Sequence, residues 1–210
     1  MGRYVVAVTG ASGAAYARRL VQVLCAAGHD VDLIVSAAGF TVLSHELDWD
    51  DPRYAPEATA PGGSALARRC ELFFRPAGAT GAVRFHPIHD IADPLASGSV
   101  EIDAMVVVPC SMGRVAALAS GRSADLLERA ADCALKEGRR LVVVPRETPF
   151  SLIHLRNLTA LCEAGAVVLP AMPGFYHHPR SLEDIVDFLV GKVLGRLGLP
   201  QTLLPPWTGR

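Results

Sequence analysis

The stretch Tyr4-Val-Val-Ala-Val-Thr9-Gly10-Ala-Ser-Gly13 decides the fold class. A short β-branched run that ends in a glycine turn, followed by an amphipathic segment over 14–27, predicts a strand, a tight turn and a helix. Further apolar runs at 104–108, 141–144 and 166–169 alternate with helical patterns. Because these runs are apolar without interruption, they are typical of parallel strands buried on both faces of a sheet.

This order of elements predicts a single domain over residues 1–198, built on a doubly wound, mostly parallel α/β sheet with helices on both faces. Residues 199–210 contain three prolines and are expected to form a C-terminal tail. Ser181 and Asp184 predict a capping box at the last helix, and Ser123 predicts the cap of a helix that ends at Gly138. The proline- and glycine-rich segment 50–63 predicts a loop.

The composition narrows the class of protein. Of the 210 residues, 50% are hydrophobic and 20% are charged, and the formal net charge is −1. This balance supports a sizeable core and excludes a disordered chain. A nearly neutral chain is not expected to bind nucleic acid through bulk electrostatics. Because the chain is also highly apolar, we expect it to bury part of its surface in an oligomer.

We expect no membrane span and no signal peptide, because no apolar run reaches about 18 residues and the first residues read as a strand. Five widely spaced cysteines without a CxxC pair argue against a disulfide framework and a zinc site, and indicate a reducing cytoplasm. His177 and His178 are adjacent, so on an extended chain they point to opposite sides. We therefore expect no metal site.

In an open parallel sheet, ligands bind beyond the carboxyl ends of the strands. Five loops follow the predicted strands, and glycine or polar residues gather in all of them: 10–13, 36–39, 109–113, 145–149 and 170–179. The turn at 10–13 could place a phosphate on the free N–H groups of the following helix. It matches neither the dinucleotide G-x-G-x-x-G pattern nor a P-loop, and a tight turn without a ligand fits it as well.

Two further groups carry charge. Arg129 and Lys136 share one face of a helix, where they could hold two anionic groups, or could belong to a solvated face beside Glu128 and Glu137. The pair Arg146-Glu147 directly follows a buried strand between two prolines, which stiffen the loop. It could supply a rigidly held catalytic carboxylate, or a structural ion pair at the end of the strand.

Taken together, the loops resemble those of the UbiX-like flavin prenyltransferases, within the flavin-binding homo-oligomeric decarboxylase-fold group. The resemblance runs from about residue 4 to about residue 207, and only residues 50–85 match poorly. The matching motifs are Thr9-Gly-Ala-Ser-Gly13, Ala96-Ser-Gly-Ser99, Val108-Pro-Cys-Ser-Met112, Glu128-Arg-Ala-Ala-Asp132, Leu135-Lys-Glu137, Val144-Pro-Arg-Glu-Thr-Pro149, Ile153-His-Leu155 and Pro173-Gly-Phe-Tyr176.

The resemblance implies a Rossmann-like flavoprotein with an unusual activity. Enzymes of this family join the dimethylallyl group of dimethylallyl phosphate to N5 and C6 of reduced FMN, without a metal. The product, prenylated FMN, is the cofactor of UbiD-type decarboxylases. The resemblance also implies a homo-oligomer, commonly a dodecamer.

The resemblance implies roles for individual residues. The FMN-binding residues would be Gly10, Ala11, Ser12, Ser36, Ser111, Met112, Gly113, Arg114 and Arg129. The residues at the prenyl donor would be Lys136, Arg146, Tyr176, Lys192 and Trp207, with Ser97 and Gly98 from a neighbouring subunit. The catalytic residues would be Ser12, Lys136 and Glu147, with Glu147 in proton transfer to the leaving phosphate and from flavin C6.

One departure and two alternatives accompany this resemblance. Lys192 stands where many relatives have arginine, so the charge is kept but bidentate geometry is lost, and we expect weaker donor binding. Lys136 and Lys192 are the chain's only lysines, and both fall at implied phosphate ligands. The alternatives are a non-catalytic FMN-binding accessory subunit and an FMN-dependent peptidyl-cysteine decarboxylase. The latter usually carries Pro-x-Met-Asn where this chain has Pro109-Cys-Ser-Met112.

Overall fold

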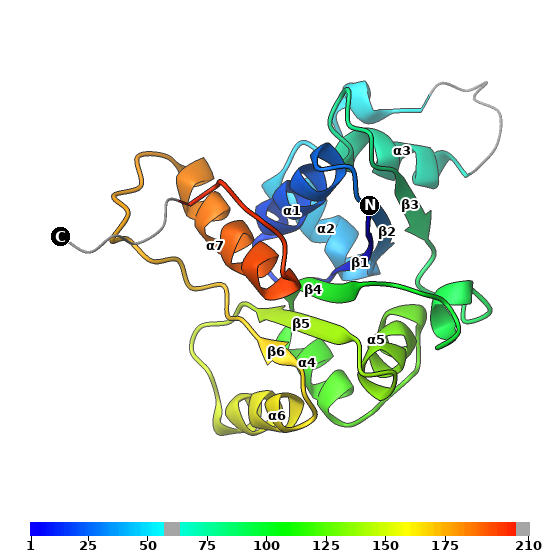
Figure 1. The fold of residues 1–210 in the computed structure, drawn as a ribbon, viewed down its shortest axis with the longest axis vertical. Coiled ribbons are helices and arrows are strands. Elements are labelled where there is room, and N and C mark those ends of the chain that lie inside the picture. The colour runs from blue at the N-terminus through cyan, green and yellow to red at the C-terminus, as the bar shows by residue number, and fades with distance from the viewer. Residues whose placement is uncertain (57–63, 205–210) are drawn as a thin grey trace.

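The computed structural model describes residues 1–56 and 64–204. Its strands form one sheet in the order β3-β2-β1-β4-β5-β6, and all neighbouring strands run parallel, as predicted (Figure 1). The order reverses between β1 and β4, and ligands bind at such a switch point. The strands are β1 (Arg3–Val8), β2 (Asp30–Val35), β3 (Val83–His86), β4 (Ala104–Cys110), β5 (Arg140–Pro145) and β6 (Val167–Val168).

Helices cover both faces of the sheet (Figure 1). One face carries α1 (Ala14–Ala26), α2 (Ala37–Glu46), α3 (Ala65–Phe74) and α7 (Leu182–Leu197), and the other carries α4 (Met112–Ala119), α5 (Leu126–Lys136) and α6 (Leu152–Glu163). Alternate strand residues point to opposite faces, so in β4 Val106 packs toward the first set and Val107 toward the second. Burial on both faces explains why these strands are apolar throughout.

Two predicted helix ends are confirmed and one is wrong. Ser181–Asp184 forms the capping box of α7, and Gly138 follows α5 with a φ of 66°. Ser123 does not cap α5. The N-cap is Asp125, whose carboxylate accepts a hydrogen bond from the N–H of Glu128 at 3.0 Å. Glu128 is fully buried, so this N–H needs a nearby acceptor, which Asp125 supplies and a residue two positions earlier does not.

Two short 3-10 helices are present: η1 (Pro52–Tyr54) lies in the predicted loop 50–63, and η2 (Pro94–Ala96) lies between β3 and β4. The rest of the proline-rich loop, residues 57–63, lies outside the described residues. Within the described part of the chain, no helix is both long and apolar enough to cross a bilayer.

A buried charged cluster fastens η2 to the sheet. Asp32 of β2 is fully buried, and its carboxylate accepts a hydrogen bond from Arg3 Nε at 2.6 Å and lies 2.9 Å from His86 Nε2. The other ring nitrogen of His86 lies 2.6 Å from the carboxylate of Asp93, the residue that caps η2. Burial lowers the pKa of His86, but its hydrogen bonds to the two carboxylates outweigh burial and raise the pKa. The imidazolium therefore joins two carboxylates.

We expect His86→Gln to destabilise the fold by about 3 kcal/mol, because it leaves the buried carboxylate of Asp32 with Arg3 alone and removes the cation beside Asp93. A raised folded pKa stabilises the protein below the unfolded value of about 6.5 and loses this effect as the pH rises through the folded value. The gap in melting temperature between wild type and variant should therefore be wide near about pH 6 and narrower near about pH 9. His89→Gln, at an exposed position, is the control. An equal gap at both pH values would contradict a charged His86.

Candidate active site

The glycine turn after β1 lies at the switch point of the sheet. Gly10 packs so closely on α2 that a Cβ there would lie 2.5 Å from the Cβ of Ala38. Gly13 precedes α1 with a φ of 115°, a conformation that favours glycine. Gly10 and Ser12 are exposed. The backbone of the turn is therefore open to a ligand.

A carboxylate that sequence reasoning missed completes this turn. Glu46, the last residue of α2, accepts hydrogen bonds at Oε2 from the N–H groups of Gly13 (2.8 Å) and Ala14 (2.9 Å), and Ser12 donates its hydroxyl to the same carboxylate. Burial raises the pKa of Glu46, but these hydrogen bonds outweigh burial, so the pKa lies below its usual value. Ser12 and Glu46 therefore form a hydroxyl–carboxylate couple in which the carboxylate is ionised.

Glu46 also occupies part of the turn at which a phosphate could bind. Two N–H groups at the start of α1, those of Gly13 and Ala14, donate to Glu46. No local motif marks this residue, which lies 32 positions after Ala14 and reaches the turn only through the packing of α2. One weak signal was available: a glutamate at the C-terminal end of a helix is disfavoured by the helix dipole, and this suggests a partner elsewhere.

Two serines begin the helices beside the turn. Ser36 follows β2 and caps α2, with its Oγ accepting a hydrogen bond from the Gly39 N–H at 3.0 Å. Ser111 follows β4 and is tied to the end of β1 by Thr9, whose Oγ1 accepts from the Ser111 N–H (2.8 Å) and donates to the Pro109 carbonyl (2.7 Å). The predicted loops after β1, β2 and β4 therefore meet at one edge.

Three predicted flavin ligands lie in the first turn of α4, and the structure places them differently. Met112 is buried and Gly113 is exposed beside the Ser111 cap. The guanidinium of Arg114, however, is held in ion pairs with Asp125 (2.6 Å) and Glu128. A contact from Arg114 to a flavin would therefore have to come from its backbone.

Arg146 and Glu147 follow β5 at the same edge of the sheet. Arg146 Nε donates to the carbonyl of Ser12 at 3.2 Å, which joins this loop to the glycine turn. The Glu147 carboxylate accepts a hydrogen bond from the N–H of Thr148 at 3.0 Å. Neither side chain has an ion-pair partner within residues 1–56 and 64–204, so the alternative of a structural ion pair is not favoured. We call Ser12, Glu46, Arg146 and Glu147 the strand-edge group.

The predicted residues of α5 lie at the opposite edge. Lys136 is the last residue of α5, shortly before β5 begins at Arg140, whereas Arg146 follows the far end of that strand. In Figure 1, α5 lies beside the start of β5, and the loop toward α6 leaves its other end. The six residues of β5 separate these ends by about 17 Å.

The outer face of α5 packs against the loop after η2. Arg129 Nε donates to the Ala96 carbonyl at 3.0 Å, and a Cβ on Gly98 would collide with the carboxylate of Glu137, which pairs with Lys136 at 2.9 Å. The predicted residues Ser97, Gly98, Arg129 and Lys136 therefore form one surface, which we call the α5 patch. Glu128, expected as a solvated neighbour of this face, is instead buried.

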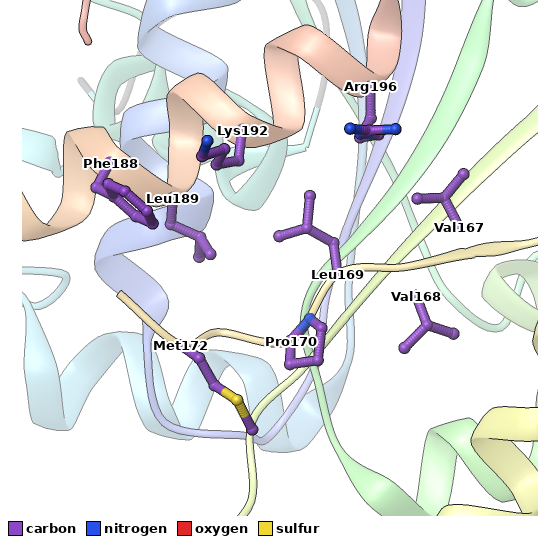
Figure 2. Close-up of a pocket in the computed structure, with 9 residues that line it drawn as sticks. All are labelled: Val167, Val168, Leu169, Pro170, Met172, Phe188, Leu189, Lys192 and Arg196. Atoms are coloured by element: carbon purple, nitrogen blue, oxygen red, sulfur yellow. The ribbon is translucent and has the colours of Figure 1, made fainter. Parts of the chain in front are cut away.

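Tyr176 and Lys192 each lie beside Phe188 of α7. Their common neighbour is Phe188, whose ring lies 5.7 Å from the Tyr176 ring and 5.4 Å from Lys192 Nζ. Figure 2 shows Lys192 and Phe188 projecting from successive turns of α7. The remaining predicted site residue, Trp207, lies outside the described residues.

The comparisons agree with this geometry. The model of the family described as Flavoprotein matches residues 2–194. A doubly wound parallel sheet, an open glycine turn at its switch point and this family match together define a flavin-binding α/β protein.

The relatives narrow this class to one family. The chain is 44% identical to the flavin prenyltransferase UbiX of Halalkalibacterium halodurans, over 98% of this chain and 93% of the relative. The structure of AnUbiX (PadA1) in complex with FMN and dimethylallyl pyrophosphate matches with a TM-score of 0.84 and 37% identity, over 100% of this chain and 98% of the other. A dodecameric FMN-dependent UbiX-like decarboxylase from Escherichia coli O157:H7 matches with a TM-score of 0.82 and 35% identity, over 99% and 100%. The chain belongs to the UbiX flavin prenyltransferase family.

Proposed function

We propose that this chain joins the dimethylallyl group of dimethylallyl phosphate to N5 and C6 of reduced FMN, giving prenylated FMN and phosphate. The observation that carries this function is the 44% identity to a UbiX flavin prenyltransferase over 98% of the chain. The strand-edge group supports it, because it places a hydroxyl, two carboxylates and a guanidinium at the switch point of a flavoprotein sheet.

The strand edge fits FMN. The exposed backbone at Gly10 leaves room beside the ring system, and α2, capped by Ser36, offers a helix N-terminus for the phosphate. The reduced flavin supplies an electron-rich acceptor when it is bound. In this proposal the remaining contacts come from Ala11, Ser12, Ser111, Met112 and Gly113, from the backbone of Arg114 and from Arg129.

Two carboxylates handle the protons. Glu147 gives a proton to the leaving phosphate and takes one from the side of flavin C6, as a positioned general acid and base. Glu46 holds the Ser12 hydroxyl near N5 and, because its pKa is lowered, stays ionised as an acceptor. Glu147 lies in the loop directly after β5, which Arg146 joins to the glycine turn, and Glu46 is held on that turn by the N–H groups of Gly13 and Ala14, so both carboxylates are kept in place.

Fixed cations stabilise the departing phosphate. Breaking the allylic C–O bond leaves the electron pair on the phosphate, and preorganised positive groups are most effective where such charge develops. We assign this role to Lys136, Arg146 and Lys192, with the Tyr176 hydroxyl.

The site is shared between copies of the chain. Lys136 and Glu147 lie at opposite ends of β5, about 17 Å apart, so one copy cannot bring both to one substrate. The α5 patch of one copy therefore faces the strand-edge group of another, which brings in Ser97, Gly98 and Arg129 as well. We propose a homo-oligomer, and specifically a dodecamer such as that of the relative from E. coli O157:H7.

The product and the location complete the proposal. We propose that the product, prenylated FMN, passes to a UbiD-type decarboxylase, which would use it as its cofactor. We also propose a cytoplasmic location, which the five free thiols support.

Phosphate release measures this function directly. Under anaerobic conditions the protein should release one phosphate per flavin, and only when reduced FMN and dimethylallyl phosphate are both present. Oxidised FMN is the matched control. A folded, FMN-loaded protein that releases no phosphate would instead be an accessory subunit, and CO2 release from a peptidyl-cysteine would indicate the decarboxylase alternative.

A further inference from the structure

A turn at residues 97–100, which we call the serine turn, continues the chain from η2 along the α5 patch. The Val100 N–H closes it by donating to the Ser97 carbonyl at 3.3 Å, and the hydroxyl oxygens of Ser97 and Ser99 lie 2.8 Å apart. Both serines are exposed, whereas Gly98 and Val100 are half-buried. The serine turn therefore offers two hydroxyl groups at the surface that the shared site brings to a neighbouring copy.

Arg139 holds the serine turn from the side of α5. Its guanidinium donates to the Gly98 carbonyl at 2.7 Å and to the Val100 carbonyl. Its own N–H donates to the Ala134 carbonyl at 2.8 Å, which fixes its backbone to the end of α5. Within residues 1–56 and 64–204, the Arg139 side chain forms no ion pair and no other hydrogen bond. Its charged group is therefore committed to the two carbonyls of the turn.

Other residues hold the chain just before the turn. Asp93 caps η2, and the Ala96 carbonyl accepts a hydrogen bond from Arg129 Nε at 3.0 Å. These contacts end at Ala96. In the described part of the chain, Arg139 is the only side chain from outside the turn that forms a hydrogen bond to residues 97–100. Its loss should therefore release the turn and leave η2 in place.

We propose that Arg139 is a positioning residue of the donor site, an inference that rests on the proposed function and its shared site. It fixes the serine turn to the end of α5, where Lys136 lies, so that the hydroxyls and the ammonium group approach the donor bound by a neighbouring copy as one rigid unit. Groups that bind a substrate are effective only while they are held in the productive geometry. Arg139 acts through the turn, because the two carbonyls already occupy its guanidinium.

Hydrogen exchange in the assembled protein tests this clamp without turnover. In Arg139→Gln, a peptide that covers the serine turn should exchange about tenfold faster than in wild type, and the peptides of β5 should not change. Arg140→Gln is the matched control, because Arg140 is the next residue, is exposed and forms no side-chain hydrogen bond with the described residues. Unchanged exchange of the turn in Arg139→Gln would overturn the clamp.

Steady-state kinetics measure the effect on the donor. In Arg139→Gln, the KM for dimethylallyl phosphate should rise about tenfold, while kcat and the KM for reduced FMN stay within about twofold, because the turn binds the donor equally in the ground and transition states. Arg139→Lys should stay impaired, since one ammonium group cannot span two carbonyls as the planar guanidinium does. A wild-type KM in Arg139→Gln, or full recovery with lysine, would overturn the proposed role.

Mixed assemblies show which copy's turn serves a site. When Lys136→Ala chains assemble with Glu147→Gln chains, the working sites take their α5 patch from the Glu147→Gln copies. Arg139→Gln added to those copies should raise the donor KM about tenfold, and added to the Lys136→Ala copies it should not change KM. Both mixtures hold the same number of substituted chains, so a general loss of stability would affect them equally. Equal KM values would overturn the positioning role.

The outcomes separate this inference from the proposed function. If wild type transfers the prenyl group and Arg139→Gln keeps the wild-type KM, the role of Arg139 is wrong and the prenyltransferase function stands. If wild type transfers no prenyl group, the proposed function and the donor role are wrong. Faster exchange of the serine turn in Arg139→Gln would then still establish the clamp, and unchanged exchange would overturn it as well.

Discussion

Glu147→Gln is expected to slow prenyl transfer by about 10²–10⁴-fold while FMN still binds. The amide has the shape of the carboxylate, and its oxygen can still accept the hydrogen bond from the Thr148 N–H that holds the side chain at 3.0 Å. It cannot exchange a proton with the leaving phosphate or with the flavin. The loop geometry should therefore survive while the proton transfer is lost.

A single-turnover measurement under anaerobic conditions gives the rate, and the flavin absorbance of the purified variant reports FMN binding. Glu163→Gln, at the exposed end of α6, is the matched control and should react like wild type. A wild-type rate in Glu147→Gln would remove this residue from the mechanism. Loss of FMN together with activity would instead indicate a structural role.

Mixing two inactive variants is expected to restore activity. Lys136→Ala disables the α5 patch and Glu147→Gln disables the strand-edge group, and each variant alone should be nearly inactive. If each site takes these two residues from different copies, about a quarter of the sites in an equal mixture combine two intact halves. The mixture should therefore recover about a quarter of the wild-type activity.

The control for this experiment is a mixture of Arg146→Ala with Glu147→Gln. Both residues belong to one loop of one copy, so every site keeps a defect and no activity should return. Co-expression of two differently tagged chains, followed by purification through both tags, provides the mixed assemblies. Failure of the Lys136 and Glu147 mixture to recover, or recovery in the control, would contradict a shared site.

The sequence predicted the fold closely because the signals for its elements are local. The run from Tyr4 to Gly13 specifies a strand, a turn and a helix without reference to the rest of the chain, and the apolar runs mark strands buried on both faces. The error at Ser123 has a different origin. Asp125 caps α5 through the N–H of Glu128, and both carboxylates pair with Arg114 of α4, a contact that forms only once α4 and α5 are packed together.

The candidate site could be predicted only in part for the same reason. Ser12, Arg146 and Glu147 could be predicted as site residues because they lie in loops after strands, and parallel strands end at one edge of the sheet. Glu46 required the packing of α2 on the glycine turn, and the ion pairs of Arg114 depend on the neighbouring helix. The candidate site is divided into the strand-edge group and the α5 patch because α5 ends at the edge of the sheet where β5 begins, and this places Lys136 there.

The mass of the flavin after anaerobic incubation with dimethylallyl phosphate tests the central claim most directly. Reduced FMN, the donor and the assembled protein are combined, and the mass of the extracted flavin is measured by mass spectrometry. Carbon–nitrogen and carbon–carbon bond formation predicts a flavin heavier by one C5H8 unit, with unmodified FMN in the sample that lacks the donor. Unmodified FMN in both samples, from protein that is folded and loaded with flavin, would contradict prenyl transfer.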